Sequence, residues 1–545
     1  SRFAIRCRCD LVAARQQHAD GDVAVDLVVF DQENVQRFIV LGIVKGSGWI
    51  QTQILVDDKF AVALGGRADT LMGLSGIGAA AQVLSRVPGT SVAVLEGRSA
   101  SGGTWDLFRY PGIRSDSDMF TFGYRWRPWP SDTSLADGPL ILDYLRTVAE
   151  EYGVDELIRY RHKVVAAAWD STDQRWTVTV EVSSGSTGGE PETRTITCGL
   201  LWGCSGYYDY ETGHAPQFPG AERFQGEIVH PQFWPEDLDH TGKKVVVIGS
   251  GATAITLVPA MAGEAEHVTM LQRSPTYVLN RPARDPLARK LAKLPEQVRY
   301  PVVRWANILM QVGSYQAFQK WPSWARKYIR SQTVKLVPDH VDVDTHFNPS
   351  YDPWDQRLCV VPNADLFKAL RGGGASIVTD TIETFDETGI RLTSGEHLEA
   401  DVIVTATGLK LKPFGGFAMT VDGAEVKLHD TMAYKALMLS DVPNFVFTIG
   451  YTNASWTLKA DLVSDFVCRM LDHLDRTGQR SFVPRRDQGV GERPFMDFQS
   501  GYVLRALDDL PVQGDRAPWL LKQNYLVDVR HIRRGELDDG VLEFA

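Results

Sequence analysis

This sequence contains little cysteine, and that scarcity already excludes several kinds of protein. Only six of its 545 residues are cysteines. They are too few for a disulfide framework, and no CxxC pair or Cys/His cluster has metal-ligand spacing, so we expect no metal site. The CxxxxC redox pair of disulfide reductases is also missing, which argues against that class.

The sequence also lacks a long apolar run and a cluster of positive charge. No apolar stretch reaches the ~18 residues of a membrane-spanning helix, and residues 1–25 carry charges where a signal peptide has its apolar core. We therefore expect no transmembrane segment and a cytoplasmic location. The net charge of -11 is spread along the chain without a run that could neutralise a phosphate backbone, so we expect no nucleic-acid ligand.

What the chain does contain is a repeated pattern of strand, turn and helix. Apolar runs followed by glycine-rich turns recur at Ser91–Glu96, Lys244–Ile248, 267–271 and 401–405. This pattern is typical of parallel strands in a doubly wound sheet and predicts an α/β fold. Between residues 284 and 335 the pattern changes to Leu, Ala, Trp, Lys and Arg at helical spacing, which predicts a helical insertion.

The clearest nucleotide-binding motif follows the predicted strand Lys244–Ile248. The sequence GSGATA at 249–254 precedes a helix-like segment, so its glycines allow a tight turn with backbone N–H groups close to a pyrophosphate. Further on, Arg273 and Ser274 stand where an NAD-binding protein carries an acid, and they suit the 2′-phosphate of NADP. A GxGxxA motif alone is weak evidence, since it also fits a plain strand-to-helix turn. We expect NADPH to bind through Gly249, Ser250, Gly251, Ala252, Thr253, Ala254, Arg273 and Ser274.

A second glycine-rich turn lies earlier in the chain and is damaged. GLSGIG at 73–78 supplies Gly73, Ser75 and Gly76, and Glu96 ends the next predicted strand with the carboxylate that FAD sites place on a ribose. The first glycine of the pattern is replaced by Leu71, and residues 68–72 are too short for a strand and its lead-in. Two turns predict two Rossmann-like dinucleotide-binding domains, one for FAD and one for NADP, but the damage leaves open a non-catalytic nucleotide-binding relic.

Two longer motifs carry a family resemblance. FQGEIVHPQFWP at 224–235 matches the FxGxxxHxxxWP fingerprint at every fixed position, and GGTWDLFRYPGIRSD at 102–116 resembles a GGTW…RYPG…D flavin loop. From about residue 68 to the C-terminus the chain resembles the type I Baeyer–Villiger monooxygenases within the flavin-containing monooxygenase family. Residues 1–66 resemble nothing that we recognise. The resemblance implies FAD contacts from Gly103, Thr104, Trp105, Asp106, Leu107, Asp116 and Val164, and NADP contacts from Arg114 and Ser115.

The resemblance also implies a catalytic pair. Arg357, after a Pro- and Trp-rich turn, matches the family's active-site arginine, although a surface charge is the plain alternative for any arginine. The chemistry needs a fixed cation, because dioxygen adds to the reduced flavin as a peroxide whose anion attacks a carbonyl. Asp116 would orient Arg357. We interpret His230 of the fingerprint as a structural linker residue, not as a base.

These observations predict an FAD- and NADPH-dependent monooxygenase that converts small ketones into esters and oxidises sulfur in thioamides or thioethers with dioxygen. A flavin monooxygenase limited to nitrogen or sulfur is the enzymatic alternative, and an oligomer is left open. CSG at 204–206 and ATG at 406–408 resemble signatures of the crossings between the two domains, and residues 182–192 fit a hairpin loop. The expected domains are residues 1–66, unassigned; 67–209, FAD-binding; 210–400, NADP-binding with the insertion at about 284–345; and 401–545, FAD-binding and C-terminal.

Overall fold

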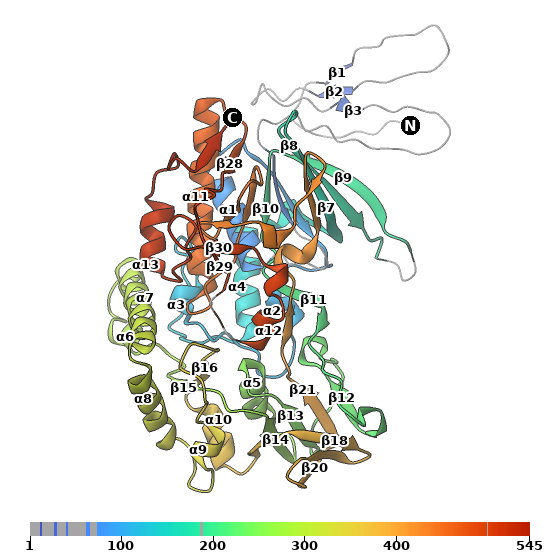
Figure 1. Ribbon diagram of the computed structural model, residues 1–545, viewed down its shortest axis with the longest axis vertical. Helices are drawn as coiled ribbons and strands as arrows, with labels where there is room; N and C mark the ends of the chain where they lie inside the picture. Colours follow the sequence, from blue (N-terminus) through green and yellow to red (C-terminus); the bar gives the residue numbers. More distant parts are fainter. Residues whose placement is uncertain are drawn as a thin grey trace.

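The computed structural model describes residues 73–185, 189–496, 498 and 500–545, and the backbone of four short strands before them. Two lobes are each built around a five-stranded parallel sheet (Figure 1). The four early strands are β1 (Leu11–Ala13), β2 (Leu27–Val29) and β3 (Val40–Leu41), which form a small antiparallel sheet, and β4 (Ala61–Gly65). Leu71 lies outside the described residues.

The first parallel sheet joins strands from both ends of the chain. Its order is β27-β10-β4-β5-β6, with β27 (Phe445–Phe447), β10 (Leu200–Gly203), β5 (Ser91–Glu96) and β6 (Ile158–Tyr160). Helices α1 (Leu74–Arg86), α4 (Gly138–Glu151) and α11 (Trp456–Thr477) share one apolar core with this sheet. Their faces are apolar at helical spacing, so burying them against the sheet stabilises this lobe.

The position of β4 corrects one expectation. It pairs in parallel with both β10 and β5, so it is the central strand of the first sheet. The sequence places residues 61–65 in an unassigned extension and predicts the remains of this strand at 68–72. The run Ala-Val-Ala-Leu suits a buried parallel strand. It was not recognised because the usual pattern has only a tight turn between the strand and the first glycines, and this run is separated from Gly73 by several residues.

The second parallel sheet has the order β12-β21-β13-β14-β17. Its strands are β12 (Glu227–Val229), β21 (Val402–Thr405), β13 (Lys244–Ile248), β14 (His267–Gln272) and β17 (Ala375–Thr379), with α5 (Ala252–Met261) and α10 (Asp365–Arg371) in the same core. Strands β13, β14 and β21, together with β5 of the first sheet, confirm the four predicted strands. Because β21 pairs with β13, this sheet continues past the boundary expected at residue 400, which was placed too early. Parallel strands of both sheets are similar apolar runs, so sequence alone did not assign β21 to its sheet.

The remaining sheets support these two. The predicted hairpin is confirmed by β8 (Arg175–Val182) and β9 (Glu192–Cys198), which pair antiparallel. They belong to a sheet with β7 (His162–Asp170), β23 (Ala418–Val421) and β24 (Ala424–Glu425). Strands β18 (Ile382–Asp386), β19 (Gly389–Leu392) and β20 (His397–Glu399) form another sheet. A ribbon of β11 (Tyr208–Gly213) and β22 (Leu409–Leu411) crosses between the lobes directly after residues 204–206 and 406–408.

The predicted helical insertion is confirmed as α6 (Pro286–Lys290), α7 (Glu296–Lys320), α8 (Pro322–Val334) and α9 (Val343–His346). It follows one side of the molecule (Figure 1). Tyr300 and Val303 of α7 join the core of the first lobe, whereas Ala325 and Ile329 of α8 pack with Tyr277 of the second. The insertion therefore bridges the two lobes.

Several short elements complete the fold. They are α2 (Thr104–Leu107), α3 (Met119–Phe122), α12 (Gly501–Leu504), α13 (Tyr525–Asp528), β15 (Val278–Arg281), β16 (Cys359–Pro362), β25 (Ala433–Tyr434), β26 (Met438–Leu439), β28 (Phe482–Pro484), β29 (Glu492–Pro494), β30 (Val512–Gly514) and β31 (Leu542–Phe544). In the part of the chain that the structure describes, no helix is both long and apolar enough to cross a membrane.

Candidate active site

The turn after β13 has the geometry of an anion-binding turn. Gly249 has φ +138°, and a Cβ there would lie 2.4 Å from the carbonyl oxygen of Ala406, so only glycine fits. Gly251 caps α5 without a side-chain hydrogen bond, and the space where its Cβ would stand is open. Ala252, Thr253 and Ala254 form the first turn of the helix. The free N–H groups of this helix end therefore fit a pyrophosphate.

Two predicted residues stand beside this turn at the end of β14. Ser250 Oγ donates a hydrogen bond of 3.1 Å to the carbonyl oxygen of Ser274, which fixes the turn against that strand end. Arg273 and Ser274 are exposed. Within the described ranges, the Arg273 side chain has no hydrogen-bond or ion-pair partner. An unpaired guanidinium beside the open helix end fits the 2′-phosphate of a bound NADP.

The earlier turn is assembled in the first lobe. A Cβ on Gly73 would lie 3.2 Å from the Cα of Gly103, so the two glycine-rich segments are in contact. Gly73 caps α1 without a side-chain hydrogen bond, and Gly76 lies in the buried first turn. Ser75 Oγ accepts a 2.8 Å hydrogen bond from Trp456 Nε1. These backbone groups fit a second diphosphate.

Glu96 ends β5 in the expected position. It is fully buried, and its Oε1 accepts a 2.7 Å hydrogen bond from the backbone N–H of Arg98. Val164 of β7 is also fully buried, within the apolar core of that sheet. The structure thus places both residues in the lobe that holds the earlier turn.

The loop at 102–107 packs tightly beside this turn. Gly103 has φ +67°, Thr104 Oγ1 lies 3.2 Å from the Tyr210 hydroxyl, and Leu107 packs near the same tyrosine. Trp105 contacts Phe122 edge-on. The buried Asp106 carboxylate is held by arginines instead of being free for a ligand: Arg98 at 2.8 Å, Arg146 at 3.0 Å and Arg109 at 3.6 Å.

The next part of the loop reaches the second lobe. Tyr110 hydrogen-bonds Thr253 in the first turn of α5, and burial raises its pKa to about 12, so its phenol stays neutral. A Cβ on Gly112 would lie 2.7 Å from Ala260 Cβ, so the loop lies directly on α5. The flavin-type loop and the NADP-type turn are therefore joined by direct contact. Sequence reasoning did not identify Tyr110 as a functional residue.

Arg114 and Ser115 are both held by protein groups. Arg114 Nη1 pairs with Asp365 Oδ2 at 2.7 Å, where α10 begins, while its Nη2 is buried without a hydrogen-bond partner. That orphaned donor fits a phosphate or carbonyl oxygen of a nucleotide. Ser115 Oγ bonds the backbone of Ser117 as both donor and acceptor, each at 3.0 Å.

Arg357 and Asp116 meet between the lobes. Arg357 Nη2 donates a charge-assisted hydrogen bond to Asp116 Oδ2, and the side chains remain 39% and 35% exposed. The negative charge of Asp116 raises the pKa of Arg357 well above its usual value, so the guanidinium stays cationic. Trp354, in the same loop, has φ +77°, a conformation that residues other than glycine rarely adopt. Arg357 is therefore held by an ion pair between the lobes.

Three tyrosines surround this pair, and sequence reasoning missed all of them. Tyr207, Tyr208 and Tyr502 are close enough to Arg357 to affect its pKa, and Tyr502 hydrogen-bonds it. Burial raises the pKa of Tyr207 and Tyr502, so both stay neutral phenols. Their only sequence signal was that Tyr207 and Tyr208 directly follow the predicted crossing at 204–206.

A chain of contacts leads from Arg357 to the earlier turn. The rings of Tyr207 and Trp456 are 5.2 Å apart, and Trp456 donates to Ser75. The same indole leaves no space for a Cβ on Gly450, which would lie 2.4 Å from the ring. The cationic pair and the first glycine turn therefore belong to one site.

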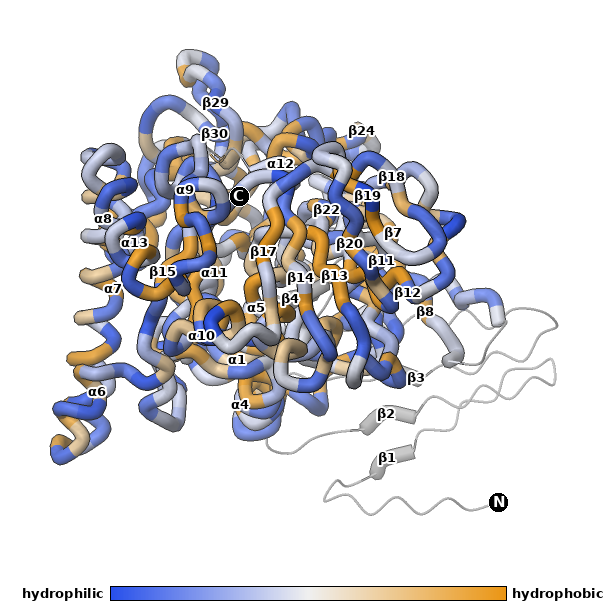
Figure 2. The backbone as a smooth tube through the Cα atoms, turned by 90° about the horizontal axis from the view of Figure 1, so that it is seen from below, coloured by the Kyte–Doolittle hydropathy of each residue, from blue (hydrophilic) through white to orange (hydrophobic). Residues whose placement is uncertain are grey.

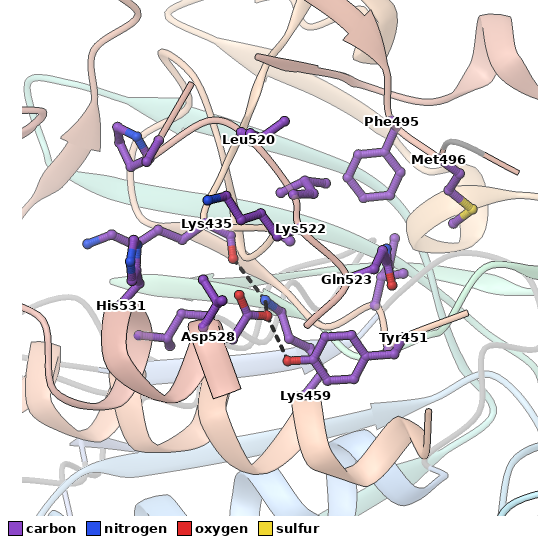
Figure 3. A pocket seen from close by; sticks show the side chains of 18 residues that line it. Lys435, Tyr451, Lys459, Phe495, Met496, Leu520, Lys522, Gln523, Asp528 and His531 are labelled. Carbon is purple, nitrogen blue, oxygen red and sulfur yellow. Dashed lines mark hydrogen bonds and ion pairs between the residues drawn. The ribbon is translucent and has the colours of Figure 1, made fainter. Parts of the chain in front are cut away.

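A small cavity is lined by Gly450, Tyr451 and segments near the C-terminus (Figure 3). Its volume of about 40 Å³ suits water but not a ketone. Asp528 accepts hydrogen bonds from Lys459 at 3.0 Å and from the Tyr451 hydroxyl at 2.7 Å. We interpret this cluster as a structural support for the segment at 449–451.

The fingerprint histidine holds the crossing between the lobes. His230 Nδ1 accepts a 3.2 Å hydrogen bond from the N–H of Gln232, and Nε2 lies 3.3 Å from the carbonyl oxygen of Gly408. A Cβ on Gly213 would lie 2.3 Å from the ring. Both ring nitrogens are engaged by backbone, which agrees with the structural interpretation.

Two parallel sheets, each with a glycine turn opening a helix, define a flavoprotein with two dinucleotide-binding domains. Residues 129–294 match the family Flavin-binding monooxygenase-like. The chain is 56% identical over 476 residues to the FAD-containing monooxygenase EthA of Mycobacterium tuberculosis, covering 87% of this chain and 96% of that protein. It is 48% identical over 87% of its length to the probable FAD-binding monooxygenase AlmA of Acinetobacter baylyi, covering 94% of that protein. The chain belongs to the flavin-binding monooxygenase family.

Solved structures share the fold. Oxidized steroid monooxygenase bound to NADP matches with a TM-score of 0.65 and 22% identity, covering 89% of this chain and 99% of that one. OTEMO in complex with FAD and NADP matches with a TM-score of 0.67 and 18% identity, again covering 89% and 99%. At these identities the likeness supports the fold alone.

Proposed function

We propose that this chain is an NADPH-dependent Baeyer–Villiger monooxygenase that also oxidises sulfur. The observation that carries the proposal is the Arg357–Asp116 pair, which is linked through Tyr207 and Trp456 to the FAD-type turn and through residues 102–116 to the NADP-type turn. The names of the relatives, FAD-containing monooxygenases, support FAD as the cofactor. The balanced reaction consumes a ketone, dioxygen, NADPH and a proton, and yields an ester, NADP⁺ and water.

The glycine turn that opens α1 and the turn after β13 would hold the two nucleotides. FAD would be bound by Gly73, Ser75, Gly76, Glu96, Val164 and residues 103–107, with Asp106 contributing only its backbone, and NADPH by Arg114, Ser115, residues 249–254, Arg273 and Ser274. Bound FAD supplies the transfer of electrons from NADPH to dioxygen.

The protein's own groups would control charge and water. The Arg357 guanidinium stabilises negative charge as it develops on the carbonyl oxygen of the substrate, because a fixed cation away from bulk water interacts strongly with an anion. Asp116 holds that guanidinium in one orientation. The rings of Tyr207, Tyr208 and Tyr502 limit the access of water. We propose a small ketone, thioamide or thioether as substrate and the cytoplasm as the location.

The test is a visible spectrum of the purified full-length chain with added FAD, followed by anaerobic NADPH and then by air with a simple ketone. We expect the band of oxidised flavin at ~450 nm, its bleaching by NADPH, and an ester product. A thioether alone giving product would identify the enzyme limited to nitrogen or sulfur. A chain that stays colourless would support the nucleotide-binding relic.

A further inference from the structure

Positive charge is concentrated in the helical insertion. Residues 286–335 contain ten Lys and Arg residues but a single acid, Glu296, in a chain whose net charge is -11. The expectation of evenly spread charge is therefore wrong for this segment. It was missed because the prediction considered only uninterrupted basic runs, and the basic residues of this segment are separated by apolar and polar ones.

Most of these cations are free of acidic partners. Arg304 is buried, and Arg326 and Arg330 pair with Asp352 and Asp344, both at 2.6 Å. The other seven form no ion pair with any described residue: Arg289, Lys290, Lys293, Arg299, Lys320, Lys327 and Lys335.

An exposed apolar stripe follows the outer face of α7. Val298, Val302, Trp305 and Leu309 are spaced by four, three and four residues, so they lie on one side of the helix, and each is 44–54% exposed. The opposite side, with Tyr300 and Val303, is buried. Both sides of α7 therefore carry apolar residues, and packing among the residues that the structure describes does not explain the outer side.

Aromatic side chains extend the stripe where α7 meets α8. Trp321, Trp324 and Tyr328 are 55%, 51% and 42% exposed. Trp324 and Tyr328 are stacked with ring centroids 5.6 Å apart, and Lys320 Nζ lies 5.2 Å from the Trp321 ring. Tryptophan and tyrosine beside lysine are typical of helices that lie at a membrane–water interface.

Figure 2 shows α6, α7 and α8 together at one edge of the molecule, with hydrophobic stretches along α7. We define the α7–α8 face as Val298, Val302, Trp305, Leu309, Trp321, Trp324 and Tyr328 with the seven free cations. This face is accessible without any movement of the two sheets.

We propose that the α7–α8 face docks the protein on the surface of an anionic lipid bilayer. Its cations match a negative headgroup layer, and its apolar side chains reach the depth of the upper acyl chains. A second copy of this chain is a poorer partner, because symmetric pairing would place two positive faces against each other. The proposal is independent of the proposed reaction.

The test is co-sedimentation of the full-length protein with vesicles of phosphatidylcholine containing 30% phosphatidylglycerol. Vesicles of pure phosphatidylcholine and a buffer with 0.5 M NaCl are the comparisons. We expect binding to the anionic vesicles, at least about tenfold weaker binding to the neutral ones, and loss at high salt, because the headgroup attraction is screened.

Matched variants locate the surface. Lys293→Glu with Lys327→Glu should weaken vesicle binding at least about tenfold, since each charge near the surface contributes. Lys410→Glu with Lys427→Glu changes two exposed lysines elsewhere and should leave binding unaltered. Trp321→Ser with Trp324→Ser should weaken binding even at low salt, and circular dichroism checks that each variant is folded.

Two outcomes would overturn the proposal. One is sedimentation that is absent or indifferent to lipid charge. The other is a concentration-dependent dimer that Trp321→Ser with Trp324→Ser abolishes while no vesicle binding is found, which would assign the α7–α8 face to contact between copies.

Discussion

Arg357 donates a hydrogen bond to Asp116 across 241 residues of sequence, and this pair joins the two lobes at the candidate active site. Arg357 lies in the loop before β16, and Asp116 follows the flavin-type loop of the first lobe. Neither lobe contains the pair by itself. The pair therefore depends on contact between the two lobes, and it also determines the charge of the site.

Replacing Arg357 should affect the oxygenation of the ketone but not the reduction of the flavin by NADPH. Arg357→Ala removes the cation but none of the residues proposed to hold either nucleotide, so anaerobic bleaching by NADPH should persist while ester formation falls at least ~100-fold. Stopped-flow absorbance measures the first quantity and gas chromatography the second. Arg284→Ala, which removes an exposed arginine, is the control. Undiminished ester formation by Arg357→Ala would remove this residue from its proposed role.

Asp116→Asn should have a smaller effect than Arg357→Ala. The variant keeps the guanidinium but loses the ion that orients it, so we expect kcat to fall while the KM for NADPH changes little. Steady-state kinetics at several NADPH concentrations measures both constants. An effect on the KM alone would assign Asp116 to nucleotide binding instead of positioning.

Arg273 should decide between the two nicotinamide cofactors. Arg273→Ala removes a guanidinium proposed to contact the 2′-phosphate, and a charge-assisted contact is worth about 1.5–3 kcal/mol, so the KM for NADPH should rise roughly 10- to 150-fold. The KM for NADH, which lacks that phosphate, should hardly change. Arg534→Ala serves as the matched exposed control. Equal changes for both cofactors would refute the assignment.

His230 should make the crossing between the lobes sensitive to acid. Burial lowers the pKa of His230, because the charged ring is removed from water. Protonation of Nδ1 would also end the hydrogen bond that it accepts from the N–H of Gln232. The unfolded pKa is about 6.5, so the contribution of His230 to stability is present above that pH and is lost as pH falls through the lower folded pKa. Thermal unfolding between pH 5 and 8 should show a smaller acid loss for His230→Gln than for the unchanged chain. His429→Gln, at an exposed position, should not alter the profile.

Arg304 should be essential for anchoring α7. It is 4% exposed, pairs with Asp461 at 3.3 Å, and donates to the carbonyl oxygens of Phe120 and Gly123. Arg304→Met leaves a buried carboxylate without its cation and should cost about 3–5 kcal/mol of unfolding free energy in urea titrations. Arg299→Met on the same helix should stay within about 0.5 kcal/mol. Similar losses for both variants would contradict a specific role of Arg304.

The sequence by itself determined the elements whose signals are local. An apolar run followed by glycines and a helical segment has few alternatives, so β5, β13, β14 and α5 were predicted close to their observed bounds. Gly249 was identified by the motif, and its backbone conformation requires glycine. The fingerprint at 224–235 and the loop at 102–116 then indicated the family.

Only the tertiary structure decided which distant residues meet. Tyr207, Tyr502 and Trp456 look like ordinary core aromatics in the sequence, and they become part of the site because two crossings and a C-terminal segment bring them to Arg357 and Ser75. The same holds for β4, whose apolar residues are recognised as a central strand only from their pairing with β10 and β5. Side-chain pairing across lobes depends on packing between segments hundreds of residues apart, so it cannot be predicted from the spacing of residues along the chain.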